Sequence, residues 1–537
     1  MVFKFGGITM SSIGKGISYR VFLQKYRRYC GKDAFNFNLL AVISLTDSLK
    51  SSFGPFGRDK LVLGENEFAL AKDGFTILNT ISPFSPVITL LKDSVKNLKE
   101  TVGDGTLTAI LLVGELLKKA VSLIVRGIPS SKIIKGYSLA CKEALNMFET
   151  LSHKFKIEDS SQTQKIIYTV LHGSGLTDVE IAESKLCNLI QEAVYTVLEK
   201  SEDGVDFDLD QVKVMGLKEG FAEQSMLVKG VVFKSLSELH PTMPRRIVNP
   251  KILLVNSPIG VEKPYTATKI ELTTPESLGR VRDYKVKSVL RFIDRVKQLG
   301  VNVIFCSRKI DDISMSYFAK NDILAVPNLS NTDIRRLSNA TYARPVFNLE
   351  NLQKSDLGQA EIVEERRFGR VKRIFVECKN PKAVTIFLLG ATKRATVATR
   401  KALKAISTVI RKPRVLVGCG AIEMEVAQRL KSYALKLEGK EQLAALAFAD
   451  ALESLPLILA SNSGINPLDA LVKLRELHKH GKSTAGFDVE KGKMVEKIEK
   501  WIEPLEVKSQ VLKSAVETTS VILSLDDILV NMEILKQ

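Results

Sequence analysis

The sequence predicts a multidomain protein that combines mostly helical parts with an α/β part. Its 537 residues exceed what one hydrophobic core usually organises, so two to four domains are expected. Hydrophobic residues recur at three- and four-residue steps in the first and last thirds of the chain, which indicates helices. The middle third alternates short apolar runs with helical patterns. This order predicts an α/β domain inserted into a helical one.

The composition is that of an ordinary globular protein, with 45% hydrophobic and 26% charged residues. Apolar runs fall short of the roughly 20 residues that span a bilayer, so we expect no membrane partner. The six cysteines are scattered and include no CxxC pair, which argues against a disulfide framework or a zinc site. Cysteines of this kind favour a reducing, cytoplasmic location.

The net charge of +18 invites a nucleic-acid interpretation, because clustered Lys and Arg attract phosphate backbones. The densest clusters lie at 25–29, within a basic N-terminal arm over residues 1–30, and at 366–373. Neither cluster is accompanied by zinc-finger spacing or by the aromatic motifs of RNA-binding sheets. A solvated basic surface is therefore the favoured interpretation, and nucleic acid the less favoured partner.

Several helices are predicted in the terminal thirds. Residues 133–148 place apolar side chains on one helical face, and Ser130 or Ser131 is available as the N-cap. This pattern predicts an amphipathic helix that faces the core. Similar patterns predict helices over residues 421–437, 441–455 and 507–523.

The middle third begins its α/β pattern with two short apolar runs, 251–255 and 301–306, which predict buried strands. Between them, residues 286–296 form one apolar helical face that Gly300 ends. A second helix near 311–319 and a strand over 323–326 follow. Strands that alternate with helices in this way indicate a partly parallel sheet.

The stretch from Thr101 to Thr106 places the Asp104 carboxylate between two glycines, just before a long apolar helical pattern. Glycines let backbone N–H groups approach phosphate oxygens, and a helix N-terminus attracts anions. A carboxylate oxygen is a ligand that Mg²⁺ prefers. The same run is also good turn and capping chemistry, so by itself it does not decide between the two.

Three further glycine-containing motifs occur at 54–60, 72–78 and 418–423. In this order and spacing, the four motifs resemble those of the equatorial domain of group II chaperonins, the thermosome and its eukaryotic cytosolic relatives. The resemblance covers about residues 31–530. Further matching stretches lie at 240–245, 381–386 and 448–453.

The resemblance implies an ATP-dependent molecular chaperone subunit of a double ring, with other chaperonin subunits and non-native polypeptides as partners. ATP would drive a helical protrusion to close over the folding chamber, and residues 261–287 would form that protrusion. The implied organisation has four parts: an arm (1–30), an equatorial nucleotide-binding domain (31–152 and 402–537), a small intermediate domain (153–228 and 372–401) and an inserted α/β apical substrate-binding domain (229–371).

The family pattern also assigns expected roles to individual residues, with ATP or ADP and Mg²⁺ as cofactors. Asp104 would hold Mg²⁺, and Asp73 matches a carboxylate that helps to orient the attacking water. Glu503 would close the nucleoside side of the site, although an acidic residue before Pro504 also suits the first turn of a helix. The residues expected against the nucleotide and its phosphates are Gly54, Pro55, Gly57, Gly105, Thr106, Thr108 and Gly420.

Two positions depart from the family pattern. Val397 stands where the family has its main water-activating Asp, and no acidic residue occurs between Glu377 and Glu423. Valine cannot accept a proton, and general-base catalysis contributes about 10²- to 10⁴-fold. Leu176 stands where the family has a γ-phosphate-sensing Lys; His172 is a candidate substitute, although an incidental polar residue is the simpler interpretation.

These departures favour a chaperonin subunit that binds ATP but hydrolyses it poorly, so whether the chain is an enzyme stays open. One alternative is an ordinary ATP-hydrolysing chaperonin that uses Asp73. Another is a basic scaffold with the chaperonin fold that binds RNA or acidic partners through its +18 surface, of which residues 366–373 are a dense part.

Overall fold

The computed structural model describes residues 26–64, 68–81, 85–176, 183–201, 204–234, 240–260, 290–349 and 352–531. The chain divides into two compact units. The first contains Met1–Gly175 and Lys404–Gln537, and the second contains Leu176–Leu403. The expected protrusion at 261–287 and residues 1–25 of the basic arm lie outside the described residues. The division into three chaperonin domains stays a prediction.

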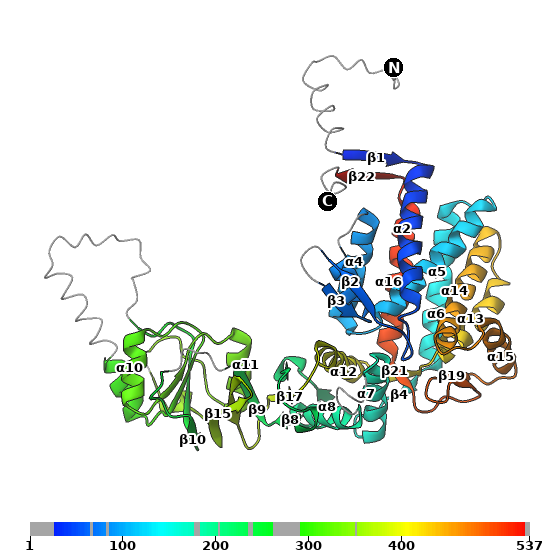
Figure 1. The fold of residues 1–537 in the computed structure, drawn as a ribbon. Helices are drawn as coiled ribbons and strands as arrows, with labels where there is room; N and C mark the ends of the chain where they lie inside the picture. Colours follow the sequence, from blue (N-terminus) through cyan, green and yellow to red (C-terminus); the bar gives the residue numbers. More distant parts are fainter. Residues whose placement is uncertain are drawn as a thin grey trace, which may run out of the picture. The chain divides into compact units, whose positions relative to one another are not determined.

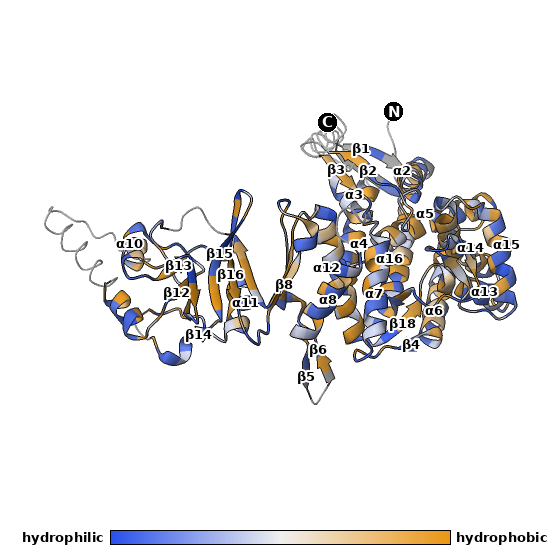
Figure 2. Cartoon of the chain, turned by 60° about the horizontal axis from the view of Figure 1, so that its bottom comes forward, coloured by the Kyte–Doolittle hydropathy of each residue, from blue (hydrophilic) through white to orange (hydrophobic). Residues whose placement is uncertain are grey.

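The first unit is a bundle of long helices around a large hydrophobic core (Figure 1). The helices α5 and α14, whose residues are mostly hydrophobic, pack against α6, and α16 packs against α5 and α6 (Figure 2). The long helices of this unit are α2 (Lys32–Lys50), α4 (Pro86–Val102), α5 (Thr106–Val125), α6 (Ser130–Leu151), α13 (Ala421–Ala434), α14 (Lys440–Asn462) and α16 (Leu505–Ser524). The helices predicted from periodicity are therefore confirmed.

The predicted N-cap of α6 is wrong. The helix begins at Ser130, so the capping position falls on Pro129, and no side chain caps the helix. Proline fixes φ near −65°, and Pro129 has φ of −62° with an extended ψ of 143°. This backbone conformation starts the helix without a side-chain hydrogen bond, which places both Ser130 and Ser131 inside the first turn.

Short helices and sheets complete the first unit. The strand β18, with β21, matters most for the site, because the pair places Leu416 opposite Glu503. The shorter helices are α3 (Gly74–Thr80), α7 (Ser160–Gly173) and α15 (Pro467–Lys479). The strands are β1 (Tyr26–Cys30) with β22 (Asp527–Asn531), β2 (Lys60–Leu63) with β3 (Phe68–Ala71), β18 (Arg414–Val417) with β4 (His153–Lys154) and β21 (Ile502–Pro504), and β19 (Gly486–Asp488) with β20 (Lys493–Val495).

Among the described residues, one helix, α14, is long and apolar enough to cross a membrane. However, 72% of its most apolar stretch is buried inside the unit. The core helix of a globular bundle has the same length and composition, and the packing of α14 against α5, α6 and α13 is that of a core helix.

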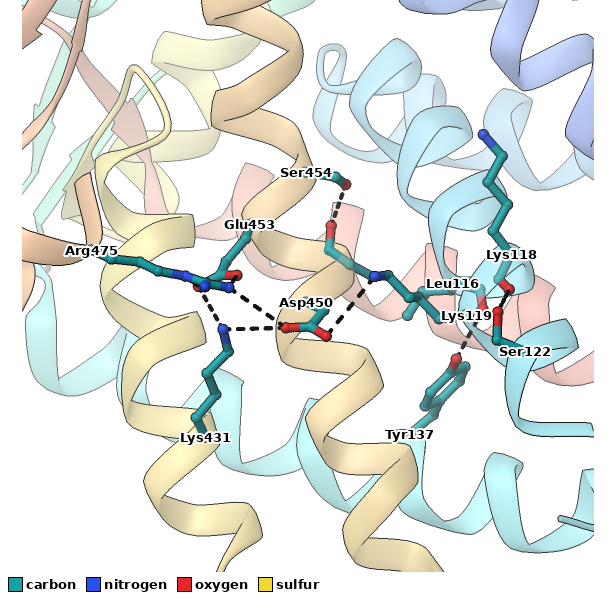
Figure 3. A network of polar contacts seen from close by, with 11 residues as sticks. Leu116, Lys118, Lys119, Ser122, Tyr137, Lys431, Asp450, Glu453, Ser454 and Arg475 are labelled. Carbon is teal, nitrogen blue, oxygen red and sulfur yellow. Dashed lines mark hydrogen bonds and ion pairs between the residues drawn. The ribbon is translucent and has the colours of Figure 1, made fainter. Parts of the chain in front are cut away.

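A buried carboxylate ties α13, α14 and α15 together (Figure 3). The Glu453 side chain is 3% exposed, and its Oε1 accepts hydrogen bonds from Lys431 Nζ and Gln428 Nε2, each at 2.8 Å. Arg475 also forms an ion pair with Glu453. Asp450, nearly one turn earlier on α14, lies 3.2 Å from Lys431. Burial of Glu453 is thus compensated by charged and polar donors.

The second unit contains the predicted partly parallel sheet, in the order β13-β12-β11-β14. The strands β11 (Lys251–Val255), β12 (Val303–Cys306) and β13 (Leu324–Val326) pair in parallel, and β14 (Gly358–Gln359) joins β11 antiparallel. The connecting helices are residues 290–298, α10 (Asp312–Lys320) and α11 (Asn331–Thr341). The α/β pattern read from the middle third is confirmed.

Besides the two-stranded pair of β5 and β6, two further sheets of the second unit were not predicted strand by strand. An antiparallel sheet has the order β10-β15-β16-β9, and a mixed sheet the order β7-β17-β8. Helix α12 begins in this unit and carries Val397, which is partly buried. The remaining elements are β5 (Glu199–Ser201), β6 (Gly204–Asp206), β7 (Val212–Gly216), β8 (Met226–Val228), β9 (Gly230–Lys234), β10 (Arg246–Val248), β15 (Ile362–Phe368), β16 (Val371–Glu377), β17 (Val384–Leu388), α8 (Glu183–Val197) and α12 (Lys393–Arg411).

Candidate functional site

The loop between α4 and α5 has the backbone shape of an anion-binding turn. Gly103 and Gly105 adopt left-handed conformations with φ of 81° and 79°. A Cβ on Gly105 would lie 2.4 Å from Val511 Cγ2, so only glycine fits there. Helix α5 begins at Thr106 with no side-chain cap, and Thr108 lies in the same first turn. The N–H groups of that turn can therefore serve an anionic ligand.

Asp73 lies next to this loop and already has structural partners. It caps α3, where its Oδ2 accepts hydrogen bonds from the Thr76 N–H at 3.1 Å and the Thr76 hydroxyl at 3.0 Å. The Thr106 hydroxyl donates to Asp73 Oδ1 at 3.3 Å, and Lys99 Nζ lies 3.8 Å from Oδ2. The carboxylate is thus both a helix cap and a neighbour of the predicted phosphate loop.

The motif after α2 forms a tight turn. The Gly57 N–H donates to the Gly54 carbonyl at 3.1 Å, and Gly54 has φ of 76°. A Cβ on Gly57 would lie 2.3 Å from the carbonyl of Ser52, which excludes any larger residue. The turn therefore depends on both glycines.

Two side chains anchor this turn to the rest of the unit. Lys72 Nζ donates to the Pro55 carbonyl at 2.8 Å, which joins the turn to the residue before Asp73. Asn462, at the end of α14, donates to the carbonyls of Lys50 at 2.9 Å and Phe53 at 2.8 Å. The turn, Asp73 and the loop before α5 are consequently held in one place.

The loop between β18 and α13 contributes a third glycine turn. Gly420 has φ of 75°, and a Cβ there would lie 2.5 Å from Pro456 Cβ. The Gly418 N–H donates to the Trp501 carbonyl at 2.9 Å, and a Cβ on Gly418 would lie 2.9 Å from Glu503 Oε1. Cys419 is not a glycine yet adopts φ of 57°, and burial raises the pKa of its thiol.

Glu503 belongs to a buried cluster of charges. Lys508 Nζ lies 3.0 Å from Glu503 Oε1 and 2.6 Å from Glu423 Oε1. The side chains of Lys508 and Glu423 are 11% and 6% exposed, whereas that of Glu503 is 26% exposed. Burial raises the pKa of Glu503, the Lys508 charge opposes this rise, and the negative charges of Glu423 and Asp104 add to it. Asp104 is therefore within electrostatic reach of Glu503.

His172 packs in an aromatic cluster. Its ring stacks on Tyr168 with centroids 5.6 Å apart and lies 5.0 Å from the Trp501 ring. This packing supports the interpretation of His172 as a structural residue rather than a phosphate sensor. Leu176 is the first residue of the second unit.

The first unit joins several of its predicted site residues in two sets of contacts. The turn at Gly54 connects through Lys72 to Asp73, Asp73 to Thr106, and Glu503 to the glycine loop at Gly418. Val397 belongs to the second unit. Sequence reasoning gave no role to Lys72, Glu423 and Lys508. One sequence feature could have identified Lys508: it is a single lysine among the apolar residues Leu505, Val507, Val511 and Leu512 of α16.

The donor set suits a magnesium ion that arrives with phosphate. The described residues contain no group of three or more His, Cys, Asp or Glu side chains that could hold a metal by themselves. Mg²⁺ is commonly bound by one or two carboxylates together with substrate phosphates. Asp104, partly exposed beside the first turn of α5, fits the role of such a single carboxylate.

Comparison with known proteins gives consistent matches over nearly the whole chain. The family description of TCP-1/cpn60 chaperonins matches residues 45–533. A thermosome subunit of Methanopyrus kandleri is 38% identical over 530 residues, which span 97% of this chain and 96% of that protein. Thermosome subunit alpha and thermosome subunit beta of Archaeoglobus fulgidus are 37% and 36% identical over 510 residues, which span 94% of this chain and 93% of each relative.

Proposed function

Because the chain belongs to the TCP-1/cpn60 chaperonin family, in the group II branch of the thermosome, we propose that this chaperonin subunit binds adenine nucleotide and hydrolyses ATP slowly or not at all. One observation carries the proposal. The glycine turns and the uncapped first turn of α5 keep the form of a nucleotide site, while α12 has Val397 and no carboxylate. We therefore expect the subunit to have kept nucleotide binding and to have lost efficient ATP hydrolysis.

The binding half of the proposal rests on the first unit. The first turn of α5, with Thr106 and Thr108, would take the phosphates, and Asp104 would hold Mg²⁺. When bound, the ion would neutralise phosphate charge. The turn at Gly420 would lie beside the nucleoside, and the partly exposed Glu503 carboxylate would accept hydrogen bonds from ribose hydroxyls.

The hydrolytic half rests on what α12 lacks. A general base must have a lone pair within hydrogen-bond reach of the attacking water, and the Val397 side chain has none. Because no Asp or Glu occurs between Glu377 and Glu423, no neighbouring position of α12 can replace the missing carboxylate. We expect turnover about 10²- to 10⁴-fold below that of a subunit with the family Asp.

We further propose that the chain assembles with other chaperonin subunits in a homo- or hetero-oligomeric double ring and acts there on non-native polypeptides in the cytoplasm. Its relatives include alpha and beta thermosome subunits of one organism, which supports a subunit of a ring with more than one kind of chain. In such a ring, competent neighbours would supply ATP turnover.

A second candidate is an ordinary ATPase that uses Asp73, and the contact of Asp73 with Thr106 favours it. The basic scaffold is less supported. In the hairpin β15–β16, Arg366 pairs with Glu364 at 2.5 Å and with Glu377 at 2.7 Å, and Lys372 lies 3.4 Å from Glu365. Part of the basic cluster is thus neutralised within the hairpin and is not available to RNA.

The direct test is steady-state ATP turnover of the purified full chain against Val397→Asp, with Val397→Asn as the control of similar shape and no basic carboxylate. We expect little turnover by the wild type and the asparagine variant, and a gain of tenfold or more for Val397→Asp, as part of the usual general-base contribution of about 10²- to 10⁴-fold. Wild-type turnover equal to that of an ordinary chaperonin, with no gain from Val397→Asp, would refute impaired hydrolysis. If Asp73→Ala then abolished turnover, the second candidate would stand.

A further inference from the structure

Helix α16 touches two loops of the predicted nucleotide site within little more than one turn. Its Val511 lies against Gly105, where a Cβ would come within 2.4 Å of Cγ2, and Val507 Cγ1 would lie 3.4 Å from the same Cβ. Between them, Lys508 reaches Glu503 and Glu423 beside the loop at Gly418. One rigid element therefore contacts both the predicted phosphate side and the predicted nucleoside side.

Lys508 holds one particular oxygen of Glu503. The Oε1 atom lies 3.0 Å from Lys508 Nζ and so close to Gly418 that a Cβ there would come within 2.9 Å. Among the residues that the structure describes, the other carboxylate oxygen has no hydrogen-bond or ion-pair partner, and the side chain is 26% exposed. An orientation fixed at one oxygen presents the second oxygen in a defined direction, as preorganised recognition requires.

The second partner of Lys508 is closed to ligands. The Glu423 side chain is 6% exposed, its Oε1 accepts from Lys508 at 2.6 Å, and its buried Oε2 has no hydrogen-bond partner among the described residues. Glu423 lies in the first turn of α13, so a residue of a helix holds the Lys508 ammonium group. Glu423 thus positions the ammonium group rather than a ligand.

Stability alone gives no reason for this buried cluster. Burying two carboxylates and one ammonium is expensive, and a buried ion pair is often no more stabilising than apolar residues of the same volume. Most other buried residues of α16 are apolar, among them Leu505, Val511 and Leu512, and none of them is charged. A lysine in this place is better explained by what it does to Glu503.

On the premise of the proposed function, we propose that Lys508 is a positioning residue for ribose recognition: anchored by Glu423, it holds Oε1 of Glu503 so that the other carboxylate oxygen accepts from the ribose hydroxyls of a bound ribonucleotide. The burial that raises the pKa of Glu503 makes the nearby ammonium useful, because its positive charge favours the ionised carboxylate, which is the stronger acceptor. Lys508 need not touch the nucleotide itself.

The test compares binding of Mg-ADP and Mg-2′,3′-dideoxy-ADP to the full chain by calorimetry. Trp501 is the only tryptophan and its carbonyl accepts from Gly418, so its fluorescence offers an independent signal. The variants are Lys508→Met, the conservative Lys508→Arg, and Lys513→Met as the control for a lost exposed lysine on the same helix.

In the wild type we expect ADP to bind about 10- to 100-fold tighter than the dideoxy analogue, which is the usual effect of one hydrogen bond to a charged group. Lys508→Met should reduce this ratio to within about threefold of unity by weakening ADP alone, Lys508→Arg should keep most of it, and Lys513→Met should leave it unchanged. Equal weakening of both nucleotides by Lys508→Met would show a merely structural role and overturn the inference. An unchanged ratio in Lys508→Met would overturn it as well.

Three other outcomes are informative. If Lys508→Met does not fold, the double variant Lys508→Met/Glu423→Gln removes one buried negative charge together with the positive one, and the same ratio decides. If the wild type binds ADP but does not discriminate against the dideoxy analogue, ribose recognition by Glu503 is wrong while nucleotide binding stands. If the wild type binds neither nucleotide, the proposed function itself fails.

Discussion

The buried carboxylate of Glu453 offers a test of the packing of the first unit. Replacing it by glutamine keeps the shape of the side chain but removes the charge that Lys431 and Arg475 share (Figure 3). Glu453 Oε1 accepts from Lys431, Gln428 and Arg475, and Oε2 accepts from Arg475, so the glutamine NH₂ group would face at least one donor and at least one hydrogen bond is lost. We expect the variant to fold with a weakened junction of α13, α14 and α15.

The size of the effect follows from burial. Breaking a fully buried ion pair costs about 3–5 kcal/mol. Lys431 and Arg475 are partly exposed and can regain water, and Asp450 remains 3.2 Å from Lys431, so the loss should be smaller. We therefore expect Glu453→Gln to reduce the free energy of unfolding of this unit by about 2–4 kcal/mol.

The assay is urea unfolding followed by the fluorescence of Trp501, the single tryptophan, which lies in the same unit. The matched control is Glu476→Gln on α15, where the pair with Lys473 at 3.2 Å is about half-exposed on both sides. Exposed pairs of this kind contribute about 0–1 kcal/mol. Equal losses for the two variants would refute the argument that burial sets the magnitude.

Three further outcomes are expected. Gly420→Ala should lower the melting temperature more than Gly464→Ala, because a Cβ at position 420 would come within 2.5 Å of a proline side chain. Gly464 has a similar φ of 85° but no atom of another described residue within 4 Å of the added Cβ. Equal shifts of the melting temperature would mean that the backbone conformation alone sets the cost. The Lys132 ammonium lowers the pKa of Glu441 to about 2. The stability that the Glu441 carboxylate contributes should therefore be present above its ordinary pKa of 4.5 and be lost as the pH falls toward 2. If the urea midpoint fell by the same amount over this pH range in the wild type and in Glu441→Gln, this expectation would be contradicted. Burial raises the pKa of the Cys419 thiol, so iodoacetamide at pH 8 should label the exposed Cys30 well before Cys419 in the folded chain. Peptide mass spectrometry would measure the order of labelling. The reverse order would contradict the burial of the Cys419 thiol.

Local patterns in the sequence were sufficient for much of the fold. The helical periodicity of 421–437 and 507–523 predicted α13 and α16, and the apolar runs at 251–255 and 301–306 predicted the parallel strands β11 and β12. Periodicity works for these elements because each must bury one face, and that requirement is written in neighbouring residues. The N-cap of α6 failed because serine capping and the backbone of Pro129 compete within a few residues, and the sequence does not say which prevails.

The candidate site divides in the same way. The expected roles of Gly54, Gly105 and Gly420 and the expected effect of Val397 follow from the sequence, because each residue type is known at its motif position. That Asp73 accepts from Thr106, and that Lys508 joins Glu503 to Glu423, was decided only by the tertiary structure. Lys508 and Glu423 are 85 residues apart, so no local pattern links them. The residues available to the site were determined by the sequence, and their partners by the packing of α16 against the loops, because contact between distant segments forms only when the core does.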